Sequence, residues 1–352
     1  MNIEEITGQV KHNCEISNAR SWGGYSICGL LLRLRELYKW EKGMQPWGKI
    51  DTTALMSWID EKERKWKEMS NQEFRNIEIN GIVYNPFDVE KINEALPKGF
   101  LYGAGYVAAM RPSFFLARLD RARKEDGYNI FISGKELARD LVAALAMLQG
   151  NNILVRKESI RYFIWGKLEE SKITKNEALR CAFEDYGVSG ERINPESVEK
   201  IVEEELKSYI RHEIGEASDK IFPDKIWNEL VCLFQHSKVE LLARSVKDIL
   251  GDTNENGMLR YVIANKKRGS LGFYVALLTG FRKIIFSEIA PAYLEFRKTG
   301  DWRIAEKARK AGYEKSKSYA EKLVGIHRTG KNKGKEWMQE EIEKEILGKL
   351  KV

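Results

Sequence analysis

The sequence is poor in the residues from which most metal, redox and disulfide sites are built. It holds 4 His and 4 Cys in 352 residues, and none of the cysteines forms a Cys-x-x-Cys pair. A disulfide-rich secreted domain is therefore excluded, and we expect reduced thiols in a cytoplasmic protein. The patterns His-Glu-x-x-His, Glu-x-x-His and Gly-x-Ser-x-Gly are all absent, so three common hydrolase and di-metal signatures do not apply.

Long hydrophobic runs and proline are also scarce. The longest apolar run, 271–281, ends at Arg282, whereas about 30 Å of hydrocarbon takes roughly 20 apolar residues to cross. We therefore expect no membrane partner. Only 7 Pro are present, which leaves room for long helices, and the hydrophobic fraction of 43% is typical of a globular chain.

Helical periodicity covers most of the chain. Helices are expected at 27–40, 51–69, 86–96, 112–124, 135–148, 158–170, 174–186, 195–217, 224–235, 238–250, 257–267, 271–297, 301–326 and 335–350. Strand patterns lie only in the N-terminal half: a hairpin around Asn80-Gly81, and short strands at 128–132 and 153–155. The predicted fold is mainly α, with a helical C-terminal half and an α+β N-terminal half that carries a small hairpin or sheet.

The most linker-like stretch is Val188–Pro195, which contains Gly190 and ends in proline. A division there gives a mixed part, 1–188, and an all-helical part, 189–352. A break near 150–152 is almost equally favoured, so the boundary is expected between 150 and 195. A single fused core is the alternative, because the sequence shows no flexible linker.

Two glycine-rich stretches resemble nucleotide-binding motifs, but each lacks a feature that the motif requires. Gly103-Ala-Gly105-Tyr-Val-Ala108 fits G-x-G-x-x-A, but the apolar stretch before it is too short for a central strand, so we expect a closely packed helix entry. Gly325–Asn332 resembles a phosphate-binding loop, but Asn332 replaces the hydroxyl residue that holds Mg²⁺. We expect a solvated basic turn there.

The predicted helix 195–217 places ionisable residues beside its apolar stripe. At 100° per residue, Glu213 falls in the middle of the stripe formed by Val198, Val202, Leu206, Tyr209, Ile210 and Ala217. His212 and Glu216 lie to one side of it and form an i, i+4 pair that can share a ligand. A carboxylate on such a stripe is costly unless it is paired or neutralised.

A second acid, Glu288, falls on the apolar stripe of the predicted helix 271–297. Together these residues point to a metal-dependent or acid–base hydrolase, which is the alternative to the binding or interaction protein that the charge distribution favours. Glu213 would be the general base or a metal ligand, His212 and Glu216 ligands of a divalent metal or proton shuttles, and Glu288 the second catalytic carboxylate. The alternative is a structural network in which arginines pair with these acids.

The net charge of +7 lies entirely in the last part of the chain. Residues 297–352 contain 16 Lys+Arg and 9 Asp+Glu, and the rest of the chain is balanced. This placement favours a cytoplasmic binding or interaction protein whose partner is anionic, such as nucleic acid. The residues expected to contact phosphates are Arg328, Lys331, Lys333 and Lys335. A solvated helix face is the alternative.

Three stretches, 13–40, 209–216 and 240–296, resemble an uncharacterised bacterial protein family of unknown function. The resemblance covers most of the chain and implies a bacterial-type intracellular protein with a helical C-terminal half. It implies no activity, cofactor or site. The substrate, the identity of a metal and a homo-oligomeric state are left open by the sequence.

Overall fold

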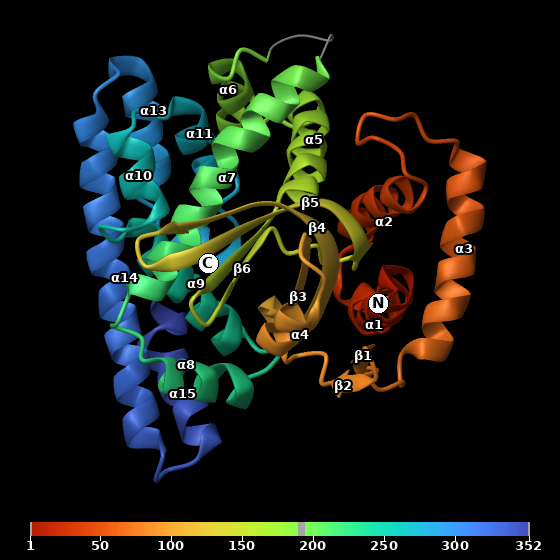
Figure 1. The fold of residues 1–352 in the computed structure, drawn as a ribbon. Coiled ribbons are helices and arrows are strands. Elements are labelled where there is room, and N and C mark those ends of the chain that lie inside the picture. The colour runs from red at the N-terminus through yellow and green to blue at the C-terminus, as the bar shows by residue number, and fades with distance from the viewer. Residues whose placement is uncertain (1, 189–193, 351–352) are drawn as a thin grey trace. The chain divides into compact units, whose positions relative to one another are not determined.

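The chain folds as two units that divide between Glu170 and Ser171. The computed structural model describes residues 2–188 and 194–350 (Figure 1). The first unit combines helices with a sheet, and the second is helical throughout its described residues, which confirms the predicted α+β class. The boundary favoured by the sequence, after Val188, adjoins residues 189–193, which lie outside the described residues.

Five helices belong to the first unit: α1 (Ile3–Ser21), α2 (Ile27–Glu41), α3 (Thr52–Met69), α4 (Val89–Ala95) and α5 (Lys157–Ile173), the last running just past the boundary. Their starts follow ordinary capping chemistry. The Asp51 carboxylate accepts a hydrogen bond from the Ala54 backbone N–H at 2.8 Å, as expected for the N-cap of α3. Asn2 and Ser26 cap α1 and α2 in the same way.

The first unit contains a hairpin and a five-stranded sheet. The hairpin of β1 (Ile77–Ile79) and β2 (Ile82–Tyr84) turns at Asn80-Gly81, as predicted. The sheet has the order β3-β4-β5-β7-β6, with β3 (Phe100–Val107), β4 (Arg111–Glu125), β5 (Tyr128–Arg139), β6 (Ala146–Gln149) and β7 (Asn152–Arg156). Strands β3, β4 and β5 form an antiparallel meander, and β7 runs parallel to β5.

Two of the predicted helices in this unit are wrong. The range 112–124 belongs to β4, and 135–148 covers the end of β5 and most of β6. Residues 112–117 are all buried, and α1 packs on this stretch, where the Ser17 hydroxyl donates to the Pro112 carbonyl at 2.5 Å. A strand that is covered on both faces shows no alternation of apolar and polar residues, so its sequence does not distinguish it from a buried helix.

The expected helix entry at Gly103 is also wrong, because this residue lies in β3 opposite Phe115 of β4. A Cβ at Gly103 would collide with the Phe115 ring. The glycine therefore provides room for an aromatic side chain of the neighbouring strand rather than for a phosphate group.

A fully buried ion pair joins β5, β7 and α5. The Arg156 guanidinium donates to both carboxylate oxygens of Glu136, at 3.0 and 2.8 Å, and the Ser159 hydroxyl donates to the same carboxylate at 2.7 Å. Burial alone would raise the pKa of Glu136, but the guanidiniums of Arg156 and Arg139 outweigh burial and lower it.

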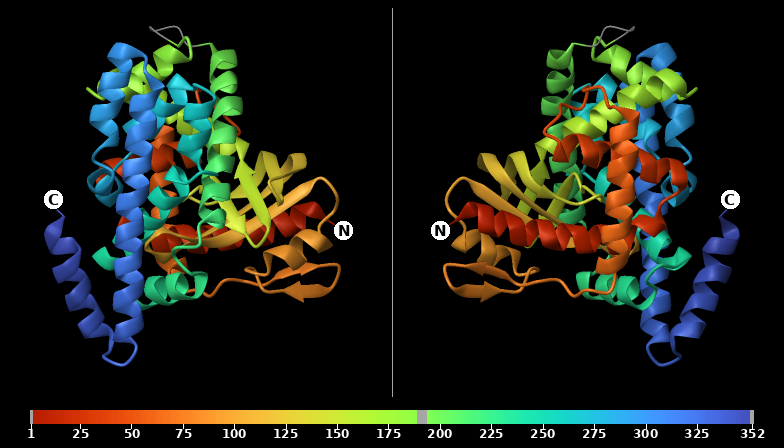
Figure 2. Two further views of the ribbon diagram at one scale, coloured as in Figure 1. Left: turned by 90° about the vertical axis from the view of Figure 1, so that its left-hand side faces the viewer. Right: turned by 90° about the vertical axis from the view of Figure 1, so that its right-hand side faces the viewer.

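Ten helices form the described part of the second unit: α6 (Glu177–Asp185), α7 (Pro195–Ser218), α8 (Asp224–Leu233), α9 (Lys238–Thr253), α10 (Met258–Ala264), α11 (Arg268–Ala276), α12 (Gly280–Ile285), α13 (Ile289–Thr299), α14 (Trp302–Gly330) and α15 (Lys335–Glu345). The longest of them, α14, forms a hairpin with α15 (Figure 2). One apolar core runs from α8 to the C-terminal helices. No helix in the described residues has the length and apolar character needed to span a bilayer.

The single helix predicted at 271–297 is broken into α11, α12 and α13. Thr279 is extended, and Gly280 follows it with a φ of 53°, a conformation that favours glycine. A second break precedes α13 at Glu288. The continuous apolar stripe on which Glu288 was placed therefore does not exist.

We expect Glu136→Gln to destabilise the protein by about 3 kcal/mol at pH 7, because it leaves Arg156 as a buried charge without its counterion. The folded-state pKa of Glu136 lies below its ordinary value of 4.5, so its contribution is complete above that pH and is lost as the pH falls through the folded-state value. Urea unfolding from pH 7 to pH 3 should show the difference between wild type and variant shrinking. Glu73→Gln, at a side chain that is 94% exposed, is the control. A pH-independent difference would contradict the prediction.

Candidate functional site

Helices α7 and α9 cross at two glycines (Figure 1). A Cβ on Gly251 would lie 2.7 Å from Cγ and 2.9 Å from the backbone nitrogen of Glu216, and a Cβ on Gly215 would collide with the Gly251 carbonyl oxygen. Only hydrogen atoms fit at this crossing, so the two backbones approach more closely than any larger residues would allow.

The same five-residue pattern occurs on both helices at the crossing. Helix α7 carries His212-x-x-Gly215-Glu216, and α9 carries Asp248-x-x-Gly251-Asp252. Residues three and four apart share one helix face, so each glycine is flanked by the ionisable side chains of its own helix. The close approach of the glycines therefore brings four ionisable side chains together. We call these four and Glu213 the α7–α9 cluster.

The deepest member of the cluster is Asp252, whose side chain is fully buried. One of its carboxylate oxygens accepts a hydrogen bond from Nδ1 of His212 at 2.7 Å, and the other accepts from Nη2 of Arg282 at 2.9 Å. Burial by itself would raise the pKa of Asp252, but the positive charge of His212 and then that of Arg282 lower it. Asp252 is thus an ionised anchor for the imidazole.

The imidazole of His212 is oriented by this anchor. Because Nδ1 donates to Asp252, Nε2 is directed to the other side, where it lies 3.4 Å from Oε1 of Glu216. Burial would lower the pKa of His212, but the carboxylates of Asp252, Glu216 and Glu213 raise it to about 10. The ring therefore has a strong tendency to hold a cation at Nε2, either a proton or a metal ion.

Negative charge exceeds fixed positive charge in the cluster. Its four carboxylates meet two permanent cations: Lys247, 3.7 Å from Glu216, and Arg282, 3.8 Å from Asp248. Burial, together with the negative charge of Glu216, raises the pKa of Glu213 to about 7 and that of Asp248 to about 6. When all four carboxylates are ionised and the imidazole is neutral, the cluster lacks two positive charges, which is the charge of a divalent metal ion.

A metal ion also fits the spacing of the side chains. Ligand atoms of His212, Glu216 and Asp248 all lie within 4.8 Å of one another. Their side chains are 21%, 17% and 31% exposed, so solvent reaches them. One imidazole nitrogen and two carboxylates are ordinary ligands for divalent first-row metals, and three protein ligands leave coordination positions for water.

The sequence identified part of this site. Glu213 is buried, which confirms its inward position, and His212 and Glu216 lie side by side as predicted. Glu288 was misplaced: it stands at the N-terminus of α13, is 38% exposed, and accepts a hydrogen bond from Nζ of Lys315 at 2.9 Å. Asp248, Asp252 and Arg282 complete the site. The sequence reasoning assigned no role to the two aspartates, and it named Arg282 only as one of the arginines that could pair with the acids in a structural network.

The four basic residues expected to contact phosphates, Arg328, Lys331, Lys333 and Lys335, are exposed at the turn between α14 and α15. Three of them contact the protein itself: Lys331 lies 3.3 Å from Glu229, Lys333 lies 4.2 Å from the centre of the Trp337 ring, and Lys335 lies 5.8 Å from that of Phe234. Such contacts are typical of a solvated helical hairpin. Nucleic-acid binding at this turn stays a prediction.

Comparison with known proteins gives a family but no activity. Residues 5–156 match the model of the N-terminal domain of a family of unknown function (DUF6866), and residues 161–345 match the model of its C-terminal domain. The matches cover nearly the whole chain and confirm the resemblance to a family of unknown function. No curated protein and no solved structure matches the chain.

We expect Gly251→Ala to destabilise the protein by about 2 kcal/mol, because its methyl group would force α9 away from α7. Gly325→Ala is the matched control: this glycine also lies within a helix, α14, but nothing is within 4 Å of an added Cβ. There the alanine should leave stability unchanged or raise it by up to about 1 kcal/mol. Thermal unfolding measures both, and equal stability of the two variants would contradict the close contact.

Proposed function

Since the chain belongs to a family of unknown function (DUF6866), we propose its function from the geometry of the chain itself. The helical unit binds a divalent first-row metal ion such as Zn²⁺ or Mn²⁺ through His212, Glu216 and Asp248. The bound ion serves a hydrolytic reaction. The predicted helix 195–217 thus retains its proposed role, and the second helix of the site is α9 rather than 271–297.

One observation carries this proposal: three ligand atoms within 4.8 Å of one another, with the imidazole among them oriented by a buried carboxylate. Metal-bound histidines usually donate their second ring nitrogen to a carboxylate, which fixes the tautomer and makes the ligand more basic. Asp252 has this position relative to His212. The other ring nitrogen, Nε2, lies 3.4 Å from Oε1 of Glu216, which is one of the three candidate ligands.

The reaction follows from the open coordination positions. A divalent ion held by three protein ligands lowers the pKa of a bound water to about 7 and so supplies a hydroxide at neutral pH. Glu213, next to His212 in sequence, is the carboxylate that we assign as the general base accepting the water proton. Arg282 and Lys247 offset part of the negative charge that the ligands bring to the site.

We expect wild-type protein, stripped with a chelator and dialysed against Zn²⁺ or Mn²⁺, to retain one metal ion per chain. His212→Asn should bind the ion more than about 100-fold more weakly, because it removes Nε2 while leaving a donor for Asp252. Isothermal titration calorimetry and elemental analysis measure affinity and stoichiometry.

The chain offers a control with the same spacing. His236 and Glu240 repeat the His-x-x-x-Glu pattern, but the Glu240 carboxylate accepts a hydrogen bond from the His236 backbone N–H and the His236 side chain is exposed. His236→Asn should therefore retain full affinity. Equal metal binding by both histidine variants, or none by the wild type, would refute the metal centre.

We expect the metal-loaded protein to hydrolyse at least one activated probe among nitrophenyl esters, nitrophenyl phosphate and bis-nitrophenyl phosphate. Glu213→Gln should lower kcat by about 100-fold or more and leave the metal content unchanged, because a general base contributes at that scale. Absence of turnover by a fully loaded wild type would remove the hydrolase assignment while the metal site stands.

A further inference from the structure

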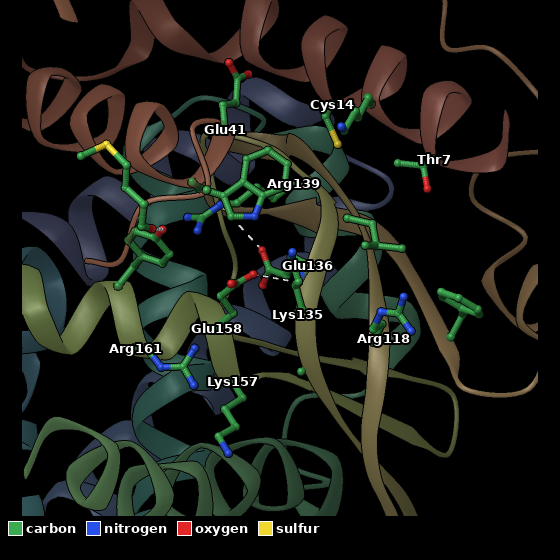
Figure 3. A pocket seen from close by; sticks show the side chains of 18 of the residues that line it. Thr7, Cys14, Glu41, Arg118, Lys135, Glu136, Arg139, Lys157, Glu158 and Arg161 are labelled. Carbon is green, nitrogen blue, oxygen red and sulfur yellow. Dashed lines mark hydrogen bonds and ion pairs between the residues drawn. The ribbon is translucent and has the colours of Figure 1, made fainter. Parts of the chain in front are cut away.

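The first unit contains a partly open cavity of about 1130 Å³ (Figure 3). Its wall is formed by α1, α2, β4, β5 and the start of α5, which contribute Thr7, Glu41, Arg118, Lys135 and Lys157 respectively. All of these elements lie within the first unit, so the cavity is separate from the α7–α9 cluster. Its volume exceeds what a single small ion occupies and corresponds to the size of an organic ligand.

Arg139 is a buried cation in this wall with unused donors. It is 4% exposed, and its Nε and Nη1 have no hydrogen-bond partner among the described residues. Its ionic contact with Glu136 is long, 3.7 Å from Nε to Oε2, because that carboxylate is already held by Arg156 at 2.8 Å. A buried guanidinium that lacks partners is costly, and an anion that brought an acceptor oxygen to these donors from the cavity side would offset that cost.

Two aromatic rings lie against the same guanidinium, but they accept no hydrogen bonds from its N–H groups. The Tyr162 ring centre lies 5.2 Å and the Trp40 ring centre 6.0 Å from the guanidinium carbon of Arg139. Such cation–π contacts hold a charged group in place but accept no N–H donor in the plane of the guanidinium. Both rings also line the cavity, so an anion there would lie beside an apolar surface.

Positive charge predominates in the lining once existing ion pairs are taken into account. Six basic and six acidic residues line the cavity. Three of the acids are paired with cations outside the lining: Glu15 with Lys62 and Lys65, Glu41 with Lys62, and Glu136 with Arg156. The remaining three acids are fewer than the six bases of the lining, of which Arg139, Lys157 and Arg161 also interact with other residues of the protein. One of the three acids, Glu158, has a pKa raised by burial and by the negative charge of the neighbouring Glu136.

The bases surround the cavity from several elements. Arg118 comes from β4, Lys135 from β5, and Lys157 and Arg161 from α5 (Figure 3). Lys157 also lies 3.8 Å from the Asp120 carboxylate, whereas Arg118 and Lys135 are exposed at the cavity. Donors that approach from different directions suit a tetrahedral phosphate better than a planar carboxylate, which matches a single fork of donors.

We propose that this cavity binds a phosphorylated small molecule, with a phosphate group on Arg139 and its neighbouring charges on Arg118 and Lys135. The organic part of the ligand would lie along Trp40 and Tyr162. This binding site is additional to the metal centre proposed for the helical unit and does not depend on it.

The test uses pyrophosphate as the probe and the full chain in the His212→Asn background with chelator present, so that no metal at the α7–α9 cluster contributes. Isothermal titration calorimetry should detect binding that weakens as salt is raised. Arg118→Ala and Lys135→Ala should each weaken binding about tenfold or more, because each removes a charged donor. Lys124→Ala, at an exposed lysine on the same strand as Arg118 but outside the cavity lining, should leave it unchanged.

Arg139→Gln should abolish binding. If this buried substitution prevents folding, the variants at the exposed residues, Arg118→Ala and Lys135→Ala, still test the proposal. Citrate is the carboxylate comparison and should bind at least about tenfold more weakly than pyrophosphate. Undetectable pyrophosphate binding by the parent protein would overturn the proposal. Equal weakening by Lys124→Ala would assign the binding to general surface charge, and equal affinity for citrate would overturn the phosphate assignment.

Discussion

The candidate metal centre depends on one steric constraint, the contact of Gly215 with Gly251 where α7 crosses α9. Each glycine lies one residue before an acid and three residues after another ionisable side chain. The four carboxylates repel one another and lose hydration when they are gathered, so apolar packing must help to hold them together. Both helices bury apolar side chains, and the glycines set how close the ionisable side chains come.

The sequence predicted the half of the site that lies on one helix. Periodicity alone placed Glu213 inward and His212 beside Glu216, because these relations need only the angle between successive residues. Asp248 and Asp252 lie on another helix, and no local rule says which helices cross or where. The repeated spacing, an ionisable residue followed three positions later by glycine and then by an acid, was the available signal. Its meaning depends on the tertiary contact.

The errors in the fold have the same origin. The start of the strand at 112–124 looked helical because residues 112–117 are buried on both faces, which removes the alternation that identifies a strand. Glu288 was placed by extending one helical phase through Gly280, where the backbone turns left-handed. The helices at 301–326 and 335–350 were predicted well because each has an exposed face, and the hairpin at Asn80 was predicted because its turn chemistry is local.

The missing hydrogen-bond partners of the Arg139 guanidinium affect the stability of the first unit. A guanidinium that the native state leaves short of partners lowers the free energy of unfolding of the empty protein. Any molecule that satisfies this group binds the folded form alone, and so it adds its binding free energy to the resistance of the fold against denaturation. The free energy of unfolding of this unit then rises with the fraction of molecules that hold a ligand. The ligand-free form unfolds most readily and is therefore the form that proteases cleave most easily.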